Sequence, residues 1–363
     1  MDTAQLNETT AAKTKKHYEI LDGLRGVAAL CVVMFHFMEF IIPDYKNNFI
    51  AHGFLSVDFF FCLSGFVIAY AYDDRIEKLG VKTFFKLRLI RLHPLVFIGA
   101  ILGVLTYLFD PFVDLYARYG FGQTVAMFFS AAFLIPYPSI PERYYNLFYL
   151  NAPSWSLFWE YAANVAYAFF LYKISNRLLW LMTLVAAGLL FYTAHKYGML
   201  AIGWGRSTYP GGAPRVFFSF LMGLLLYRSN WVIRSPLGFV AVSTLLVLTF
   251  LIPFIKEFNF FIEPLLVVFY FPFLVSLGAG AQLSARSHKL CLFLGELSYP
   301  LYMVHYPFLW VFASYLQTQK PSTSQLQVLI PILFALIVSF AYVVLVYLDK
   351  PIRQYLKEKL ITR

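Results

Sequence analysis

The chain has 363 residues, of which 60% are hydrophobic and only 13% are charged. This composition excludes an ordinary soluble domain, in which charged residues make up about a quarter of the chain. The net charge of +10 does not indicate nucleic-acid binding, because the basic residues are scattered between apolar runs instead of forming one patch. The composition therefore indicates a polytopic membrane protein.

Apolar stretches long enough to cross a bilayer as helices recur along the chain. The ten predicted spans are residues 20–42, 53–72, 92–109, 154–173, 177–195, 214–229, 236–255, 259–281, 297–317 and 327–348. A shorter piece, 121–135, is bounded by glycines and a proline, and we expect it to be re-entrant or interfacial. The basic stretch 73–92 is expected to be an amphipathic surface helix. The predicted fold is an all-α bundle of about ten transmembrane helices.

The distribution of lysine and arginine supports ten crossings. Cytoplasmic loops carry an excess of these residues, and ten spans place both termini and the more basic loops on one side. We therefore expect a polar cytoplasmic tail at 1–17, a transmembrane domain at 18–350 and a basic cytoplasmic tail at 351–363. The three cysteines lack the spacing of a disulfide framework or a zinc site, so no metal is expected.

The first apolar stretch contains an arginine and a histidine. Arg25 and His36 are eleven residues apart, which places them on one helix face and about 16 Å apart along the axis. Charged or polar side chains are costly at membrane depth and usually have a function there. One helix face therefore carries two functional candidates at two depths.

Two acidic residues are predicted at the depth of His36. Asp58 and Glu160 lie near the outer starts of their spans, each about 9 Å inside. A carboxylate that orients an imidazole is the arrangement of general-base catalysis, so we expect His36, Asp58 and Glu160 to be catalytic. The alternative is a His–Asp pair that only joins helices. Glu39 could orient His36 instead, although we expect it to extend to the interface.

Basic residues gather at the predicted cytoplasmic end. Arg88 and Arg91 lie about one helical turn apart, and with Arg25 they form a cluster suited to a phosphate-rich donor. Positive-inside anchoring is the alternative, but it does not explain Arg25 inside a span.

A late segment carries polar residues on one helix face. Ser298, Tyr302 and His305 follow at intervals of four and three residues. With Ser64 and Trp155 they are candidates for substrate contact or pore lining. A packing role is equally consistent with His305, and an interfacial belt is the simplest interpretation of Trp155.

Six segments carry a resemblance to a known family. They are LDGLRGVAALCVVMFHF at 21–37, GFLSVDFFFCLSGF at 53–66, RLIRLHP at 88–94, WSLFWE at 155–160, GELSYPLYMVH at 295–305 and DKPIR at 349–353. Through them the chain resembles the integral-membrane acyltransferase type 3 family of bacterial O-acyltransferases over nearly its whole length. The spacing of Arg25 and His36 matches the hallmark of that family.

The resemblance implies about ten helices around a pore in the bacterial inner membrane. It further implies transfer of an acyl group, most simply acetyl, from cytoplasmic acyl-CoA to a hydroxyl of a carbohydrate or glycoconjugate. The donor phosphates would lie near Arg25, Arg88 and Arg91, and His36 would act as general base or transient acyl carrier. Many relatives carry a hydrolase-like domain after the membrane part, whereas we expect this chain to be a stand-alone transferase. Membrane lipid is an expected partner and nucleic acid is not.

A second hypothesis is a proton-coupled exporter or flippase of a polar metabolite or glycolipid. In that case Asp58, Glu160, His36 and His305 would form a proton relay. The sequence lacks an inverted repeat, which counts against this reading.

Overall fold

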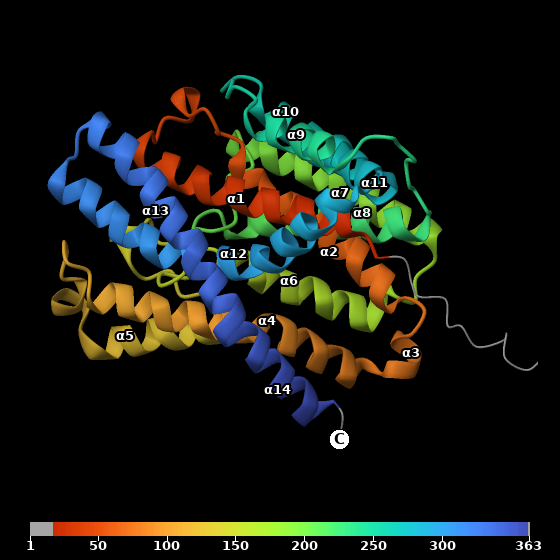
Figure 1. The fold of residues 1–363 in the computed structure, drawn as a ribbon, viewed down its shortest axis with the longest axis horizontal. Coiled ribbons are helices and arrows are strands. Elements are labelled where there is room, and N and C mark those ends of the chain that lie inside the picture. The colour runs from red at the N-terminus through yellow and green to blue at the C-terminus, as the bar shows by residue number, and fades with distance from the viewer. Residues whose placement is uncertain (1–16, 362–363) are drawn as a thin grey trace, which may run out of the picture.

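The computed structural model describes residues 17–361, which fold into one bundle of helices (Figure 1). Within this range there is no β-strand, and the only bridges are isolated, between Asn146 and Gly205 and between Ser235 and Ala281. The predicted all-α class is confirmed.

The helices are numbered in chain order. They are α1 (Glu19–Ile41), α2 (Ser56–Tyr72), α3 (Ile76–Leu79), α4 (Val81–Leu108), α5 (Leu115–Phe133), α6 (Ser154–Ala166), α7 (Asn176–Tyr197), α8 (Gly212–Arg228), α9 (Phe239–Phe250), α10 (Asn259–Leu265), α11 (Phe271–Gly280), α12 (Ala285–Gln319), α13 (Thr323–Val344) and α14 (Lys350–Leu360). Three π-helical turns, Tyr167–Leu171, Leu266–Tyr270 and Leu345–Asp349, extend α6, join α10 to α11 and join α13 to α14.

Several helical segments are long and apolar enough to cross a membrane, and the chain is an integral membrane protein. In the range 17–361 there are six: Glu19–Ile41, Gly53–Tyr72, Val81–Leu108, Asn176–Tyr197, Asn259–Gly280 and Thr323–Leu360. Helices α6, α8 and α9 have only 13, 17 and 12 residues. The predicted number of ten crossings is therefore not confirmed.

The segment 73–92 differs from the expectation of a separate surface helix. Helix α3 ends after four residues at Gly80, whose φ of +78° favours glycine, and α4 then runs without a break through Leu108. Arg75 and Lys78 lie at α3, and the other basic residues of this segment lie at the start of α4, where Arg88 is buried against α6. The basic residues that alternate with apolar ones here therefore lie partly in the protein interior and partly on its surface.

The short apolar piece 121–135 lies largely in α5. This helix is kinked at Gly120, which has a φ of +70°, and it packs along α4 (Figure 1). Whether the segment crosses the membrane stays a prediction.

Glycines let the central helices approach closely. A Cβ added to Gly26 of α1 would lie 2.5 Å from the Leu294 carbonyl of α12. A Cβ added to Gly65 of α2 would lie 2.1 Å from the Phe220 carbonyl of α8. Small residues at such crossings are the usual means of packing helices in membranes. These contacts bring α1 against α12 and α2 against α8.

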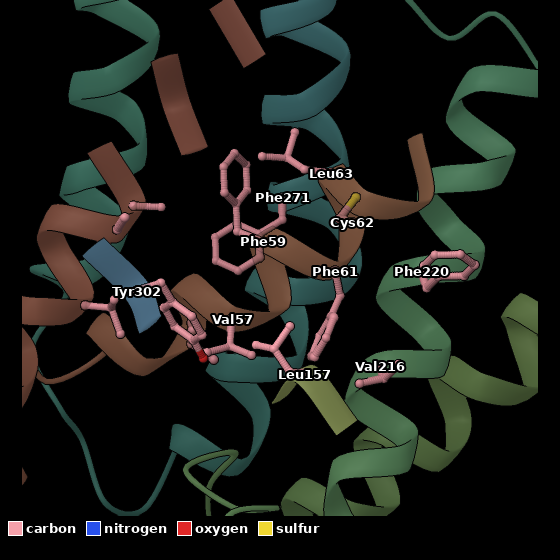
Figure 2. Packing of buried hydrophobic residues seen from close by; sticks show 14 of the residues in the cluster. Val57, Phe59, Phe61, Cys62, Leu63, Leu157, Val216, Phe220, Phe271 and Tyr302 are labelled. Atoms are coloured by element: carbon pink, nitrogen blue, oxygen red, sulfur yellow. The ribbon is translucent and has the colours of Figure 1, made fainter. Parts of the chain in front are cut away.

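Apolar side chains fill the space around these crossings. Figure 2 shows Phe59 of α2 against Phe271 of α11, with ring centroids 5.6 Å apart in an edge-to-face arrangement. Val57 and Leu157 lie beside Tyr302 in the same view. The polar side chains described next are therefore set in an apolar frame.

Candidate active site

Two cavities lie in the bundle. The first has a volume of about 450 Å³ and is called the basic-end cavity, because its lining includes Arg25, Arg88, Arg91 and Arg353. The second has a volume of about 260 Å³ and is called the loop-end cavity. Its lining includes His36, Glu39, Arg215, Tyr45, Tyr144, Trp155, Trp204, Tyr306 and Trp310.

Arg25 reaches from α1 to the start of the apolar part of α12. Its Nε donates a hydrogen bond to Ser298 Oγ at 2.9 Å, and its NH2 donates to the Gly295 carbonyl at 2.8 Å. An ion pair of 3.1 Å joins NH2 to Asp22, one helical turn earlier. Three contacts therefore hold the guanidinium in the wall of the basic-end cavity, and they include the predicted Ser298.

Glu160 belongs to this same cavity, and not to the site of His36. Its Oε1 accepts hydrogen bonds from Arg88 NH2 at 2.8 Å and from Ser64 Oγ at 2.6 Å. The expectation that Glu160 meets His36 is therefore wrong. Depth along a span does not fix the face of the helix, and an arginine satisfies a buried carboxylate better than a neutral imidazole does. Ser64 lines this cavity as predicted.

The remaining charges of the basic-end cavity are also largely paired. Arg353 NH2 lies 2.6 Å from Asp349, and Glu296 pairs with Lys350 at 2.8 Å. Arg91 is the exception, since it lines the cavity without an acidic partner within residues 17–361. The cavity is therefore an ionic network with one unpaired guanidinium.

His36 lies in the loop-end cavity beside Glu39. Its Nδ1 donates to Glu39 Oε1 at 2.8 Å, which leaves Nε2 as the nitrogen available to a ligand. Its ring stacks on that of His305, with centroids 5.4 Å apart and planes at 22°, and the edge of Tyr306 packs against it at 4.8 Å. Together with Phe35, whose ring centroid lies 5.1 Å away, these rings and one carboxylate hold the imidazole in place.

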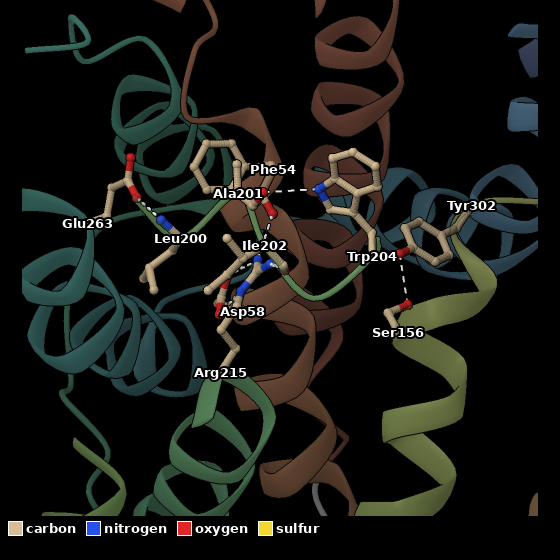
Figure 3. Close-up of polar contacts among 10 residues, drawn as sticks. All are labelled: Phe54, Asp58, Ser156, Leu200, Ala201, Ile202, Trp204, Arg215, Glu263 and Tyr302. Atoms are coloured by element: carbon tan, nitrogen blue, oxygen red, sulfur yellow. Dashed lines mark hydrogen bonds and ion pairs between the residues drawn. The ribbon is translucent and has the colours of Figure 1, made fainter. Parts of the chain in front are cut away.

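Asp58 does not pair with His36, and the carboxylate that contacts His36 is that of Glu39. The carboxylate of Asp58 makes a two-point contact with Arg215: Nε to Oδ1 is 3.1 Å and NH2 to Oδ2 is 2.6 Å (Figure 3). Both side chains are almost completely buried, and Arg215 also donates to the Ile202 carbonyl. An arginine matches both carboxylate oxygens at once, which an imidazole cannot do.

The sequence contained a signal for Arg215 that our reasoning did not use. Like Arg25, it stands inside an apolar stretch, and a charge in such a stretch requires a partner. Glu39 was considered and set aside, because its position three residues after His36 is equally compatible with exposure at an interface.

The other predicted lining residues divide between the cavities. Trp155 lines the loop-end cavity, where its ring lies 5.1 Å from the Arg215 guanidinium. Tyr302 lines both cavities. His305 lines neither: it is fully buried, donates from Nδ1 to the Leu301 carbonyl at 3.0 Å and supports His36 from behind. Within residues 17–361 no group of three His, Cys, Asp or Glu side chains could hold a metal ion.

Comparisons with known proteins found a matching family model and similar proteins. A family model described as an acyltransferase domain matches residues 18–348. Protein 2 in the picA locus of Rhizobium radiobacter is 33% identical over 163 residues, which are 42% of this chain and 82% of that protein. O-acetyltransferase OatA of Staphylococcus aureus is 30% identical over 115 residues, which are 31% of this chain and 18% of OatA. No solved structure matches the chain.

Proposed function

The chain belongs to the integral-membrane acyltransferase type 3 family, and from this premise we propose that it moves an acyl group from acyl-CoA to a hydroxyl of a carbohydrate or glycoconjugate. The observation that carries the proposal is the pair of cavities. One is ionic and the other is aromatic with a fixed histidine, and they meet inside one bundle. A transferase with two unlike substrates needs such a division.

The basic-end cavity suits the donor. Phosphate groups bind arginine through strong charge-assisted hydrogen bonds, and Arg91 has no competing acidic partner in residues 17–361. Arg25 and Arg88 contribute positive charge beside it, although each is already held by a carboxylate. We therefore assign the first phosphate contact to Arg91 and a supporting role to the other two.

The loop-end cavity suits the reaction. His36 Nε2 removes the proton of the acceptor hydroxyl as the oxygen attacks the thioester carbonyl carbon. A C–O bond forms, the C–S bond breaks, and the imidazolium returns the proton to the CoA thiolate. Glu39 stabilises the imidazolium through Nδ1, as the carboxylate does in a catalytic triad. This contact favours general-base action over the alternative of a transient acyl-imidazole.

The lining of the loop-end cavity supports a polyhydroxylated acceptor. Besides Tyr302, its lining includes six tyrosine and tryptophan side chains, whose faces offer apolar contact and whose edges are polar. They are Tyr45, Tyr144, Trp155, Trp204, Tyr306 and Trp310. Trp204 is fixed by a hydrogen bond from Nε1 to the Ala201 carbonyl (Figure 3). By analogy with OatA, whose name states O-acetyl transfer, we propose acetyl as the acyl group.

The proposed orientation follows the positive-inside rule. Lys78, Lys82, Lys86 and Arg75 lie at the end of the bundle that carries the basic-end cavity, which we place in the cytoplasm. The membrane is then the bacterial inner membrane, and the donor is taken from the cytoplasm.

The test uses the purified full chain in detergent, where no ion gradient exists. Labelled acetyl-CoA is supplied with cell-envelope glycans, and labelled glycan is measured. We expect transfer, and we expect His36→Ala to lower its rate on the order of 10²–10⁴-fold. The matched control is His195→Ala, which changes an exposed histidine at the end of α7. Full transfer by a folded His36→Ala variant contradicts the proposal.

A further inference from the structure

The two cavities share two lining residues. Val57 of α2 and Tyr302 of α12 contribute to both, whereas His36 lines only the loop-end cavity and Arg91 only the basic-end cavity. Val57 is 5% exposed and Tyr302 is 6% exposed. These two side chains therefore mark the boundary at which the two cavities adjoin.

Tyr302 is held in place at this boundary. Ser156 donates its proton to the Pro153 carbonyl at 3.0 Å, so the Tyr302 hydroxyl donates to Ser156 Oγ, at 2.8 Å (Figure 3). The ring edge also packs against Phe60, with centroids 5.7 Å apart and planes at 82°. The ring is therefore fixed from α6 and from α2, and the width of the boundary depends on its partner Val57.

The wall next to the boundary is apolar. Phe60, Phe61 and Leu157 line the basic-end cavity together with Val57 and Tyr302, and Figure 2 shows Leu157 next to Val57, with Phe61 beyond it. Charged side chains on the two sides of the boundary already have partners: Glu160 is paired with Arg88, and Arg215 with Asp58. A charged acyl group would lose its hydration here without gaining an oppositely charged partner, which is unfavourable.

We propose that Val57 and Tyr302 form a size filter: they limit the space for the acyl group next to the thioester, so that only a short, uncharged acyl group is presented to His36. This inference rests on the proposed acyl transfer and goes beyond it by naming the residues that select the acyl class. The physical basis is the close packing of protein interiors, where even one methylene group has to find space. An apolar pocket separates substrates that differ by one methylene by roughly 10–200-fold.

The experiment compares three donors with the purified full chain in detergent: acetyl-CoA, butyryl-CoA and succinyl-CoA. The last two have four-carbon acyl groups and differ in charge. For the wild type we expect kcat/KM for butyryl-CoA at least about tenfold below that for acetyl-CoA. Val57→Ala should raise the butyryl-to-acetyl ratio about tenfold without improving use of succinyl-CoA. Val57→Ile should lower the ratio.

The matched control is Val67→Ala, the same change in the same helix and the same cavity but away from the boundary. It should leave the donor ratio unchanged. Tyr302→Phe, which removes only the hydrogen bond to Ser156, is the second variant if Val57→Ala does not fold, and it should also raise the ratio.

Three results overturn the filter. The first is a wild type that uses butyryl-CoA as well as acetyl-CoA. The second is a donor ratio that none of the folded Val57 and Tyr302 variants changes. The third is an equal change in Val67→Ala. If the wild type transfers no acyl group at all, the proposed function fails and this inference with it. Transfer with an unchanged ratio rejects the filter alone.

Discussion

The two cavities are built by the same helices and yet differ in chemistry. Helix α1 contributes Arg25 to the basic-end cavity and His36 to the loop-end cavity, and α12 contributes Ser298 to the first and Tyr306 to the second. The basic-end cavity is ionic, whereas the loop-end cavity is aromatic with a single histidine. The difference shows that one helix contributes to two chemically different cavities according to the position of its residues along the axis.

The ion pairs of the two cavities also differ in burial. The pair of Asp58 and Arg215 behind the loop-end cavity is almost completely buried, with side-chain exposures of 0% and 1%. In the basic-end cavity Arg88 and Glu160 are 5% and 12% exposed, Arg25 and Asp22 are 25% and 22% exposed, and Arg91 is exposed and has no acidic partner in the described chain. We therefore expect charge changes to destabilise the protein at the loop end and to weaken donor binding at the basic end.

The largest effect is expected for Asp58→Asn. This change leaves the Arg215 guanidinium buried without its counter-charge, and breaking one side of such a pair costs about 3–5 kcal/mol of folding stability. Thermal unfolding of the purified protein in detergent measures the loss. Ser64→Ala, which removes a hydrogen bond at the basic-end cavity, should destabilise much less. A stable Asp58→Asn protein that has lost only activity would return Asp58 to a catalytic role beside His36.

Glu39→Gln should have the next largest effect. The variant keeps the shape of the side chain but removes the charge that stabilises imidazolium, and hydrogen bonds to charged groups contribute about 1.5–3 kcal/mol. We expect kcat to fall roughly 10–100-fold, with little change in KM for the donor. Steady-state kinetics of acyl transfer give both constants. An unchanged kcat would mean that Glu39 has no part in orienting His36.

Arg91→Gln should act at the basic end and more weakly. Loss of one charge-assisted contact to a phosphate is expected to raise KM for acyl-CoA about tenfold while kcat and unfolding temperature change little. Arg88→Gln is the informative contrast, because it also leaves Glu160 without its arginine and should lower the unfolding temperature. If Arg91→Gln lowers stability and leaves KM unchanged, Arg91 is a structural residue and not a phosphate contact.

The sequence was sufficient for the fold class and for the separation of Arg25 from His36. Helical periodicity places residues on one face of one helix, so the two depths along α1 and the shared face of Ser298 and Tyr302 could be derived. The predicted basic cluster of Arg25, Arg88 and Arg91 likewise lines one cavity. These predictions need only local geometry and the polarity of the membrane.

Pairings between helices could not be derived in the same way. The sequence predicts the same membrane depth for Asp58, Glu160 and His36, but the partner of each side chain depends on how its helix is rotated about its axis. That rotation is set by glycine contacts such as Gly65 against Phe220, which a single sequence does not reveal. Asp58 and Glu160 both pair with arginines, because a guanidinium is always positively charged and donates strong hydrogen bonds to a buried carboxylate. Arg215 makes two such bonds to Asp58, and Arg88 makes one to Glu160.

The smallest expected effect is a pH dependence of folding stability that arises from one buried histidine, His52. His52 precedes α2, its side chain is fully buried, and its Nδ1 donates to the Ile252 carbonyl at 2.9 Å. Burial lowers the pKa of His52 below its ordinary value of 6.5. Between pH 7 and pH 5 the unfolded chain therefore takes up a proton that the folded protein resists, so stability falls as the pH falls.

Thermal unfolding of the purified protein in detergent across this pH range measures the slope. His52→Gln should flatten it, and His195→Gln, which changes an exposed histidine at the same end, should keep the wild-type slope. The side chain that faces His52 is Glu263, whose Oε1 lies 3.6 Å from Nε2. If this carboxylate outweighed burial, the folded protein would bind the proton more tightly than the unfolded chain. Stability would then rise as the pH falls from 7 to 5. The sign of the slope that His52→Gln removes therefore shows whether burial or the Glu263 carboxylate has the larger effect on the pKa of His52.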